Sequence, residues 1–320
     1  MKHLRIQHSK SHIKKIRLSV ILIIIGITVG ISSAGALESS VERFVTANGL
    51  NIRYHEQGTG TPLILLHGGG LTSKMWEAFI PYAAKHFRVL APDTRGHGLT
   101  NNPDGKFSYQ LLAEDTIAFA EALKIEKPII CGYSDGGITA VTVAKNHPSF
   151  PRAIVTCGAA PVSENLTHYI AGLKLFFAIE VNNTLSDKDL DTIASERPEM
   201  VKKYQFLHQQ NNDPQYWRTL MKTVWPQWAS PGFYNAQDIS QITVPTLILL
   251  GDRDEFFQVE DAVKLLRMLP DGYLAIGPGA SHTFFRDKPE LFHSLLFDFL
   301  LNKAISNENS NSINENGRSL

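Results

Sequence analysis

A serine inside a glycine-rich hexapeptide is the residue of this sequence best suited to covalent chemistry. Residues 132–137 read Gly-Tyr-Ser-Asp-Gly-Gly and match the pattern G-x-S-x-G. They follow the apolar run 128–131 and precede a helical pattern over 138–146. That strand–turn–helix context exposes such a serine as a nucleophile. The glycines permit the strained turn, and the helix N-terminus favours developing negative charge. We therefore predict that Ser134 attacks a carbonyl carbon.

A second glycine-rich segment could stabilise the oxyanion formed by that attack. Residues 67–70 read His-Gly-Gly-Gly and come directly after the apolar run 62–66. A backbone without side chains can approach a substrate closely, and motifs of this type supply one N–H donor of an oxyanion hole while the residue after the nucleophile supplies the other. We predict these donors to be the N–H groups of Gly69 and Asp135, and we expect the His67 side chain to be structural.

The carboxylate of Asp135 has two possible roles. One role is limited to complementing the positive N-terminus of the helix. The carboxylate could instead bind a cationic group on the substrate, such as the α-amine of an aminoacyl ester, because a carboxylate close to an ammonium group gains enough energy to select among substrates. Asp135 is thus also a candidate substrate-binding residue.

The general base is expected to be a histidine late in the chain. Residues 279–282 read Gly-Ala-Ser-His, between the strand-like run 273–276 and a terminal helical pattern over 289–301. A histidine in a loop at the carboxyl end of a strand can reach over the sheet to Ser134, so we assign the base to His282. The other histidines considered lie in helical patterns: His86, His147, His168, His208 and His293.

An acid that orients the base must lie between Ser134 and His282 in the chain. Gly-Asp-Arg-Asp at 251–254 follows the apolar run 246–250, and both of its aspartates are candidates. Asp252 is next to the strand end, where it would shape the loop or pair with an arginine. Asp254 reaches further over the sheet, so we favour it. The resulting chain order of serine, aspartate and histidine is that of the α/β-hydrolases.

The elements that position these residues alternate between strand and helix. Short apolar runs indicate strands, and an Asn48-Gly49 turn separates the first two. The predicted strands cover 41–46, 51–56, 62–66, 87–91, 128–131, 153–156, 246–250 and 273–276. The predicted helices cover 75–85, 109–123, 138–146, 259–269 and 289–301. Such alternation favours a mostly parallel sheet with helices on both faces.

The alternation breaks between residues 163 and 239. This stretch has helical periodicity, many aromatic residues and no run typical of a buried strand. An insertion that leaves the sheet after one strand and returns before the next is expected to form a cap over the site. We thus predict a catalytic core of 37–162 and 240–302, a helical cap of 163–239 and a disordered, Asn/Ser-rich tail of 303–320.

The first 36 residues have the features of an export signal. An apolar run over 18–31 follows a basic segment, and Ala34 and Ala36 form an A-x-A cleavage pattern. The run is shorter than the roughly 20 apolar residues of a spanning helix. We interpret 1–36 as a signal peptide cleaved before Leu37, with an uncleaved membrane anchor over 18–36 as the alternative. The enzyme is therefore expected outside the cytoplasm, periplasmic or secreted, or anchored to the membrane.

Composition excludes several classes of function. The 320 residues include 31 Lys+Arg and 31 Asp+Glu, so no basic field attracts nucleic acid. The sequence contains no CxxC or HExxH motif, and its histidines lack the spacing of metal ligands, so we expect no metal and no cofactor. Cys131 and Cys157 lie in or beside apolar runs and are expected to be buried free thiols, although export would permit them to pair.

Together these segments resemble the α/β-hydrolase superfamily over residues 41–301. The matching pieces are LLHGGG (65–70), DTRGHG (93–98), GYSDGG (132–137), GDRDEF (251–256) and GASH (279–282). The resemblance implies the α/β-hydrolase fold, with a mostly parallel eight-stranded sheet flanked by helices and a small helical cap. It assigns the acid to the second aspartate of GDxD, Asp254, and structural roles to Asp93, Arg95 and Gly98. The sequence is most similar to the branch with valacyclovir hydrolase-like, haloperoxidase-like and lactonase-like enzymes, and serine at 134 excludes the dehalogenase and epoxide-hydrolase branches.

These features predict a serine hydrolase that cleaves an ester of a small molecule through an acyl-enzyme on Ser134. Hydrolysis of a C–C bond and cofactor-free perhydrolysis on the same triad are alternatives, because fold alone does not separate them. A non-catalytic binding protein of the same fold is a remote alternative, since such a protein is expected to lack a triad residue. No partner is predicted beyond the substrate and a membrane contact through an uncleaved N-terminus, and no oligomeric state is indicated.

Overall fold

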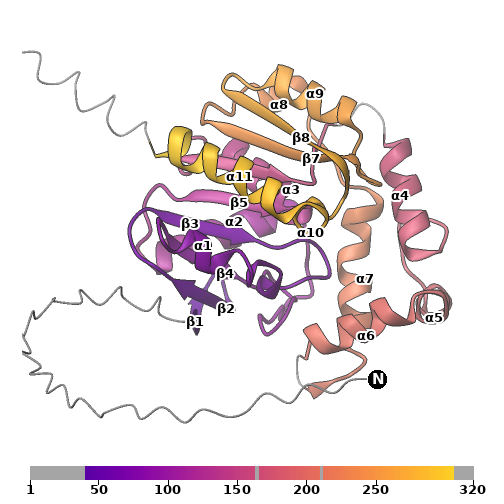
Figure 1. The fold of residues 1–320 in the computed structure, drawn as a ribbon. Coiled ribbons are helices and arrows are strands. Elements are labelled where there is room, and N and C mark those ends of the chain that lie inside the picture. Colours follow the sequence, from indigo (N-terminus) through magenta and orange to yellow (C-terminus); the bar gives the residue numbers. More distant parts are fainter. Residues whose placement is uncertain (1–39, 163–165, 210–211, 306–320) are drawn as a thin grey trace, which may run out of the picture. The chain divides into compact units, whose positions relative to one another are not determined.

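An eight-stranded sheet lies at the centre of the computed structural model, which describes residues 40–162, 166–209 and 212–305. The strand order is β1-β2-β4-β3-β5-β6-β7-β8 (Figure 1). β2 is antiparallel to β1 and β4, and all other neighbours are parallel. The strands are β1 (Val41–Ala47), β2 (Leu50–Gln57), β3 (Pro62–Leu66), β4 (Arg88–Pro92), β5 (Ile129–Tyr133), β6 (Ala153–Cys157), β7 (Thr246–Arg253) and β8 (Gly272–Ser281). The predicted mostly parallel sheet is confirmed.

Helices cover both faces of this sheet, because alternate residues of each buried strand point to opposite sides. Leu63 and Leu65 of β3 pack into one apolar cluster, and Ile64 and Leu66 pack into another. The first cluster includes residues of η1 (Ser73–Trp76), α1 (Ile80–Ala83), α10 (Phe284–Asp287) and α11 (Pro289–Phe299). The second includes residues of α2 (Tyr109–Ala122), α3 (Asp135–Asn146) and α9 (Val259–Met268). Cys131 and Cys157 are buried in the sheet as free thiols, as expected.

The prediction of one helix over 75–85 is wrong. The chain instead forms the short 3₁₀ helix η1 and the one-turn helix α1, which has Pro81 in its first turn. Proline has no N–H to donate and clashes with the preceding turn, so it disfavours the interior of a helix and is best tolerated at its beginning. Pro81 therefore favours the start of a new helical turn at Ile80 over one continuous helix.

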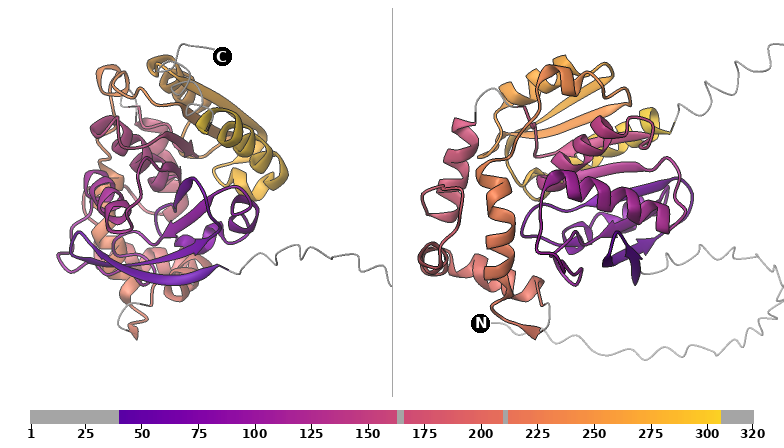
Figure 2. Two further views of the ribbon diagram at one scale, coloured as in Figure 1. Left: turned by 90° about the vertical axis from the view of Figure 1, so that its left-hand side faces the viewer. Right: turned by 180° about the vertical axis from the view of Figure 1, so that it is seen from behind.

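A helical insertion separates β6 from β7. Its helices are α4 (Thr167–Phe177), α5 (Asp187–Glu196), α6 (Pro198–Leu207), α7 (Tyr216–Ala229) and α8 (Ala236–Ile239). Figures 1 and 2 show α4, α6 and α7 together on one side of the sheet. The insertion shares an apolar core with α2 and α3, and Trp217 and Trp225 are fully buried within it. Within residues 166–209 and 212–239 the insertion contains no strand, and its one β-bridge joins Val162 to Tyr234.

The carboxyl-terminal helix extends further than predicted. A π-helical turn, Leu300–Ala304, continues α11, and Ala304 is buried against the sheet-covering helices. The chain is thus packed at the first positions of the predicted tail, because these apolar residues complete the core. Residues 306–320 of that tail and the predicted signal or anchor lie outside the described residues. None of the described helices combines the length and apolar character needed to cross a membrane.

Candidate active site

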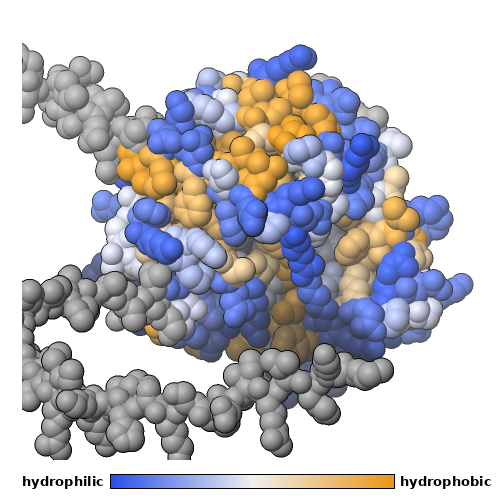
Figure 3. Space-filling view, viewed as in Figure 1, coloured by the Kyte–Doolittle hydropathy of each residue, from blue (hydrophilic) through white to orange (hydrophobic). Residues whose placement is uncertain are grey.

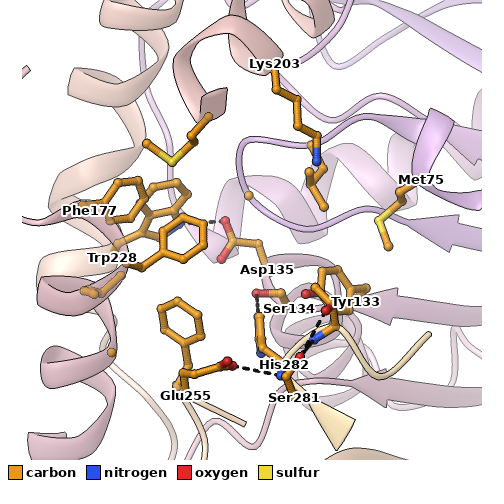
Figure 4. A pocket seen from close by; sticks show the side chains of 18 of the residues that line it. Met75, Tyr133, Ser134, Asp135, Phe177, Lys203, Trp228, Glu255, Ser281 and His282 are labelled. Atoms are coloured by element: carbon orange, nitrogen blue, oxygen red, sulfur yellow. Dashed lines mark hydrogen bonds between the residues drawn. The ribbon is translucent and has the colours of Figure 1, made fainter. Parts of the chain in front are cut away.

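Ser134 occupies a strained turn between β5 and α3. Its backbone has φ 53° and ψ −116°, and its N–H donates a hydrogen bond of 2.8 Å to the carbonyl of Cys157. A positive φ is costly for a residue other than glycine and persists only where the surroundings enforce it. A Cβ added at Gly132 would collide with the backbone of Gly136, so the turn requires glycine there. The turn holds the Ser134 side chain at the carboxyl end of the sheet, facing His282 (Figure 4).

A chain of hydrogen bonds joins the three residues predicted as a triad. Ser134 Oγ lies 3.1 Å from His282 Nε2 (Figure 4). His282 Nδ1 lies 2.8 Å from Asp254 Oδ2. An ionised carboxylate only accepts, so Nδ1 of the imidazole carries the proton and Nε2 accepts from the Ser134 hydroxyl. This is the arrangement in which an imidazole can take the proton of a serine as it attacks.

The structure separates the two candidate aspartates. Asp254 is buried, and its second oxygen accepts the N–H groups of Phe256 at 2.8 Å and Phe257 at 3.0 Å. Asp252 faces away, where its Oδ1 accepts the N–H of Gly279 at 2.6 Å. Asp254 is therefore the aspartate that contacts His282, and Asp252 fixes the loop that precedes it.

The two predicted oxyanion donors line the same cavity as Ser134. Gly69 lies in a turn closed by a hydrogen bond of 3.1 Å from the N–H of Leu71 to the carbonyl of Gly68. Asp135 is the first residue of α3, where helical N–H groups have no partner within the helix. Across the described ranges, no hydrogen-bond acceptor contacts the N–H of Gly69 or of Asp135. Both are thus available to an oxyanion, and their role stays a prediction.

His67 has a structural environment. Its ring is fully buried, with Nδ1–H donating to the carbonyl of Gly68 at 2.8 Å and Nε2 accepting the N–H of Thr94 at 2.9 Å. Burial lowers the pKa of His67 and keeps the ring neutral. Both ring nitrogens are used by the backbone, so this side chain supports the loop that carries Gly69.

The segment 93–98 also makes structural contacts. Asp93 is buried and accepts hydrogen bonds from the N–H of Ser73 at 2.8 Å and from the guanidinium of Arg53 at 3.0 Å. The Arg95 guanidinium binds both oxygens of Asp115, at 2.6 and 2.8 Å. These ion pairs connect β2, the loop after β4 and α2 below the site.

The Asp135 carboxylate joins the core to the helical insertion. Its Oδ1 accepts a hydrogen bond from the hydroxyl of Tyr109 at 2.9 Å. Its Oδ2 accepts one from the indole N–H of Trp228 in α7 at 2.8 Å (Figure 4). Burial raises the pKa of this carboxyl to about 6, although both hydrogen bonds favour the ionised form. A substrate ammonium group would have to join or displace these donors, and the predicted substrate contact of Asp135 stays a prediction.

A cavity of about 920 Å³ separates Ser134 from the helical insertion. Its inner wall is mostly aromatic, with side chains from both the insertion and the loop after β7: Tyr169, Phe177, Trp228, Phe256 and Phe257. Leu175 and Phe176 of α4 line the cavity and are also exposed, which places an apolar rim on that helix. Figure 3 shows an apolar patch over the region of α4, surrounded by polar side chains. The cavity thus suits a substrate with a hydrophobic body.

Four cationic side chains line this cavity together with three carboxylates: Lys74, Arg197, Lys203 and Arg286, with Asp135, Glu199 and Glu255. Lys203 extends from α6 toward the cavity (Figure 4), and Arg286 lies in α10, four positions after His282. Burial and then the nearby Arg286 charge lower the pKa of Lys203. Within the described ranges neither Lys203 nor Arg286 has a carboxylate partner. An anion bound beside them would relieve their mutual repulsion.

Sequence reasoning did not identify Lys203, Arg286, Tyr109 or Trp228 as site residues. Arg286 has a weak signal, because it lies only four positions after His282. The other three lie in ordinary helical patterns far from the motifs. Their position in the site depends on how α2, α6 and α7 pack, so no local pattern distinguishes them.

Comparisons with known proteins identify the family. Residues 63–295 match the Alpha/beta hydrolase family, so the chain belongs to that family. The eight-stranded sheet with its flanking helices is the α/β-hydrolase fold, and the expected fold class is confirmed. The chain is therefore an α/β hydrolase.

Several relatives have named activities. The chain is 29% identical to a 2-hydroxy-6-oxo-6-(2'-aminophenyl)hexa-2,4-dienoic acid hydrolase of Metapseudomonas resinovorans, over 82% of this chain and 92% of that protein. It is 26% identical to a 2-hydroxy-6-oxo-2,4-heptadienoate hydrolase of Pseudomonas putida, over 82% and 98%. Among solved structures, a serine hydrolase involved in carbazole degradation has 30% identity and a TM-score of 0.64, covering 82% of this chain and 98% of that one. A thermophilic esterase from Thermogutta terrifontis, at 20% identity and a TM-score of 0.61, covering 81% and 98%, shares the fold.

Proposed function

We propose that this protein is a serine hydrolase that cleaves the C–C bond beside a ketone in a small hydrophobic acid, through an acyl-enzyme on Ser134. The observation that carries the proposal is that one cavity holds both the Ser134 hydroxyl and the cationic pair Lys203 and Arg286. The pair suits the carboxylate of a substrate acid, and the aromatic wall suits its hydrophobic body.

The arrangement supports a two-step mechanism. The Ser134 oxygen attacks the ketone carbon while its proton passes to His282, and the N–H groups of Gly69 and Asp135 stabilise the oxyanion. When the oxyanion collapses, the C–C bond breaks and the leaving fragment keeps the electron pair as an enolate, which takes the proton from His282. Water then attacks the acyl-enzyme with His282 again as base, releasing the acid and restoring Ser134. Asp254 holds the imidazole in the required tautomer throughout.

The relatives favour this reaction over ester hydrolysis, which the sequence alone had placed first. Their names describe 2-hydroxy-6-oxo-dienoic acids, whose carboxylate and conjugated body match the cations and aromatic wall of the cavity. In such an acid the conjugated chain delocalises the electron pair left by C–C cleavage. Lys203, Arg286 and the aromatic wall thus agree with an acid substrate that has a hydrophobic body, whereas a simple neutral ester would leave these two cations without an anionic partner.

A substrate comparison tests the proposal. The purified protein is assayed with 2-hydroxy-6-oxo-2,4-heptadienoate and with p-nitrophenyl acetate and butyrate, and kcat/KM is measured for each. We expect the dienoate to exceed both esters at least tenfold, with the Ser134→Ala variant inactive on all three. Faster turnover of the esters would contradict C–C hydrolysis and restore the ester prediction, and residual turnover by the variant would contradict the nucleophile.

A further inference from the structure

The loop that carries the candidate oxyanion donor Gly69 is held from both sides. The carbonyl of Gly68, on one side, accepts hydrogen bonds from the Leu71 N–H at 3.1 Å and from the His67 ring at 2.8 Å. On the other side, the N–H of Gly70 donates to Nε2 of His97 at 3.2 Å. These contacts come from the core, and they leave the carbonyl of Gly70 for a further partner.

That partner comes from the helical insertion. His208 follows the last residue of α6, and its Nε2 lies 3.1 Å from the carbonyl oxygen of Gly70. Its Nδ1 accepts the N–H of Gly98 at 2.9 Å, so the proton lies on Nε2, which donates to Gly70. The ring is fully buried, and burial lowers the pKa of His208 to about 4, which keeps Nδ1 an acceptor at neutral pH.

The insertion packs directly against the loop as well. Gly70 has a φ of 66°, and a Cβ added there would collide with the hydroxyl of Tyr204, one turn before His208 on α6. A Cβ added at Gly69 would collide with the ring of Trp228 on α7. The turn therefore fits into a space whose outer wall belongs to the insertion. Among the insertion residues that the structure describes, His208 is the one that hydrogen-bonds to the turn.

We propose that His208 is a positioning residue that sets the oxyanion donor Gly69 by fixing the Gly70 carbonyl and the neighbouring Gly98 N–H. This rests on the proposed function, because Gly69 matters only if an oxyanion forms at Ser134. Oxyanion donors act when they lie within hydrogen-bond distance of the oxygen as charge develops, so a small displacement lowers transition-state stabilisation more than substrate binding. The helical insertion thus contributes to catalysis as well as to the substrate cavity.

Two ligands that have the same shape before binding, phenylboronic acid and benzoate, distinguish this positioning role from a general structural one. Phenylboronic acid becomes tetrahedral and anionic when the Ser134 oxygen adds to boron and the serine proton passes to His282. Benzoate is planar and binds without a new bond. Isothermal titration measures the affinity of both for wild type, His208→Phe, His208→Gln and Ser134→Ala, and turnover gives kcat and KM. His293→Phe is the matched control, a partly buried histidine of α11 that does not line the cavity.

His208→Phe should weaken the binding of phenylboronic acid at least tenfold while changing the affinity for benzoate less than twofold. In turnover, the same variant should lower kcat at least tenfold with KM nearly constant. His208→Gln, whose amide retains one donor and one acceptor, should show a smaller loss with the same selectivity, and it decides the question if the phenylalanine variant does not fold. His293→Phe should behave as wild type. Equal losses for both ligands, or no loss, would overturn the role of His208. If Ser134→Ala binds phenylboronic acid as tightly as wild type, the nucleophile itself is wrong and the proposed function fails with it.

Discussion

The buried carboxylate of Asp135 makes the stability of this protein depend on pH in a predictable direction. Asp135→Asn replaces it with a neutral side chain of the same shape. The amide oxygen can accept the Trp228 indole N–H, and the amide nitrogen can donate to the hydroxyl of Tyr109, which rotates to accept. Both neighbours keep a partner, so the change in hydrogen bonding costs no more than about 1 kcal/mol.

The ionisation of Asp135 has a larger effect on the stability of the protein than this change in hydrogen bonding. Burial raises its pKa from an ordinary 3.8 to about 6, so the folded protein holds this proton more tightly than the unfolded chain. The resulting stabilisation is complete below pH 3.8 and is lost as pH rises through about 6. At about 1.4 kcal/mol per pKa unit, the loss amounts to about 3 kcal/mol. The asparagine variant has no such titration and should not lose this stability.

Urea unfolding of both proteins from pH 4 to pH 8 measures this difference. The free energy of unfolding of Asp135→Asn relative to wild type should increase by about 2–3 kcal/mol over that range, with the change centred near pH 5 to 6. Asp298→Asn, an exposed aspartate of α11, should follow the wild-type curve and serves as the control. A constant difference between Asp135→Asn and wild type across the range would show that the carboxylate is not destabilised by burial.

Further predictions concern turnover, specificity and processing. Asp254→Asn should lower kcat ~10⁴-fold because the amide favours the wrong imidazole tautomer, whereas Asp252→Asn should change it only a few-fold, and the reverse order would exchange their roles. Lys203→Met should raise KM for an acidic substrate at least fivefold while Lys202→Met, the neighbouring lysine that does not line the cavity, leaves it unchanged; equal effects would remove the proposed anion contact. N-terminal sequencing of protein recovered outside the cytoplasm should begin near Leu37, and an intact N-terminus in a membrane fraction would instead favour the anchor.

Much of the site was accessible from the sequence because its chemistry needs particular backbone conformations. A serine with φ 53° needs glycine close by, and this requirement is visible in the sequence as the G-x-S-x-G pattern. The base and the acid follow β8 and β7, whose apolar runs are visible in the sequence, and parallel strands bring their carboxyl ends to one edge. The spatial grouping of Ser134, Asp254 and His282 could thus be predicted from local signals.

The contribution of the helical insertion could not be predicted in this way. His208 and Gly70 are 138 positions apart, and Trp228 and Asp135 are 93 apart. Their contacts depend on how α6 and α7 pack against the core, which hydrophobic periodicity does not specify. His208 could be set aside as the base because of its helical position, yet nothing in the sequence around it indicates contact with a glycine loop.

Formation of a covalent intermediate on Ser134 is the central claim, and covalent labelling tests it most directly. Wild type and Ser134→Ala are treated with a fluorophosphonate probe, the modified peptide is identified by mass spectrometry, and turnover of 2-hydroxy-6-oxo-2,4-heptadienoate is measured on the same preparations. We predict that the probe modifies Ser134 alone and abolishes turnover, and that the variant is unlabelled, folded and at least ~10⁴-fold less active. Labelling at another residue, or turnover by an unlabelled variant at the wild-type rate, would contradict the account.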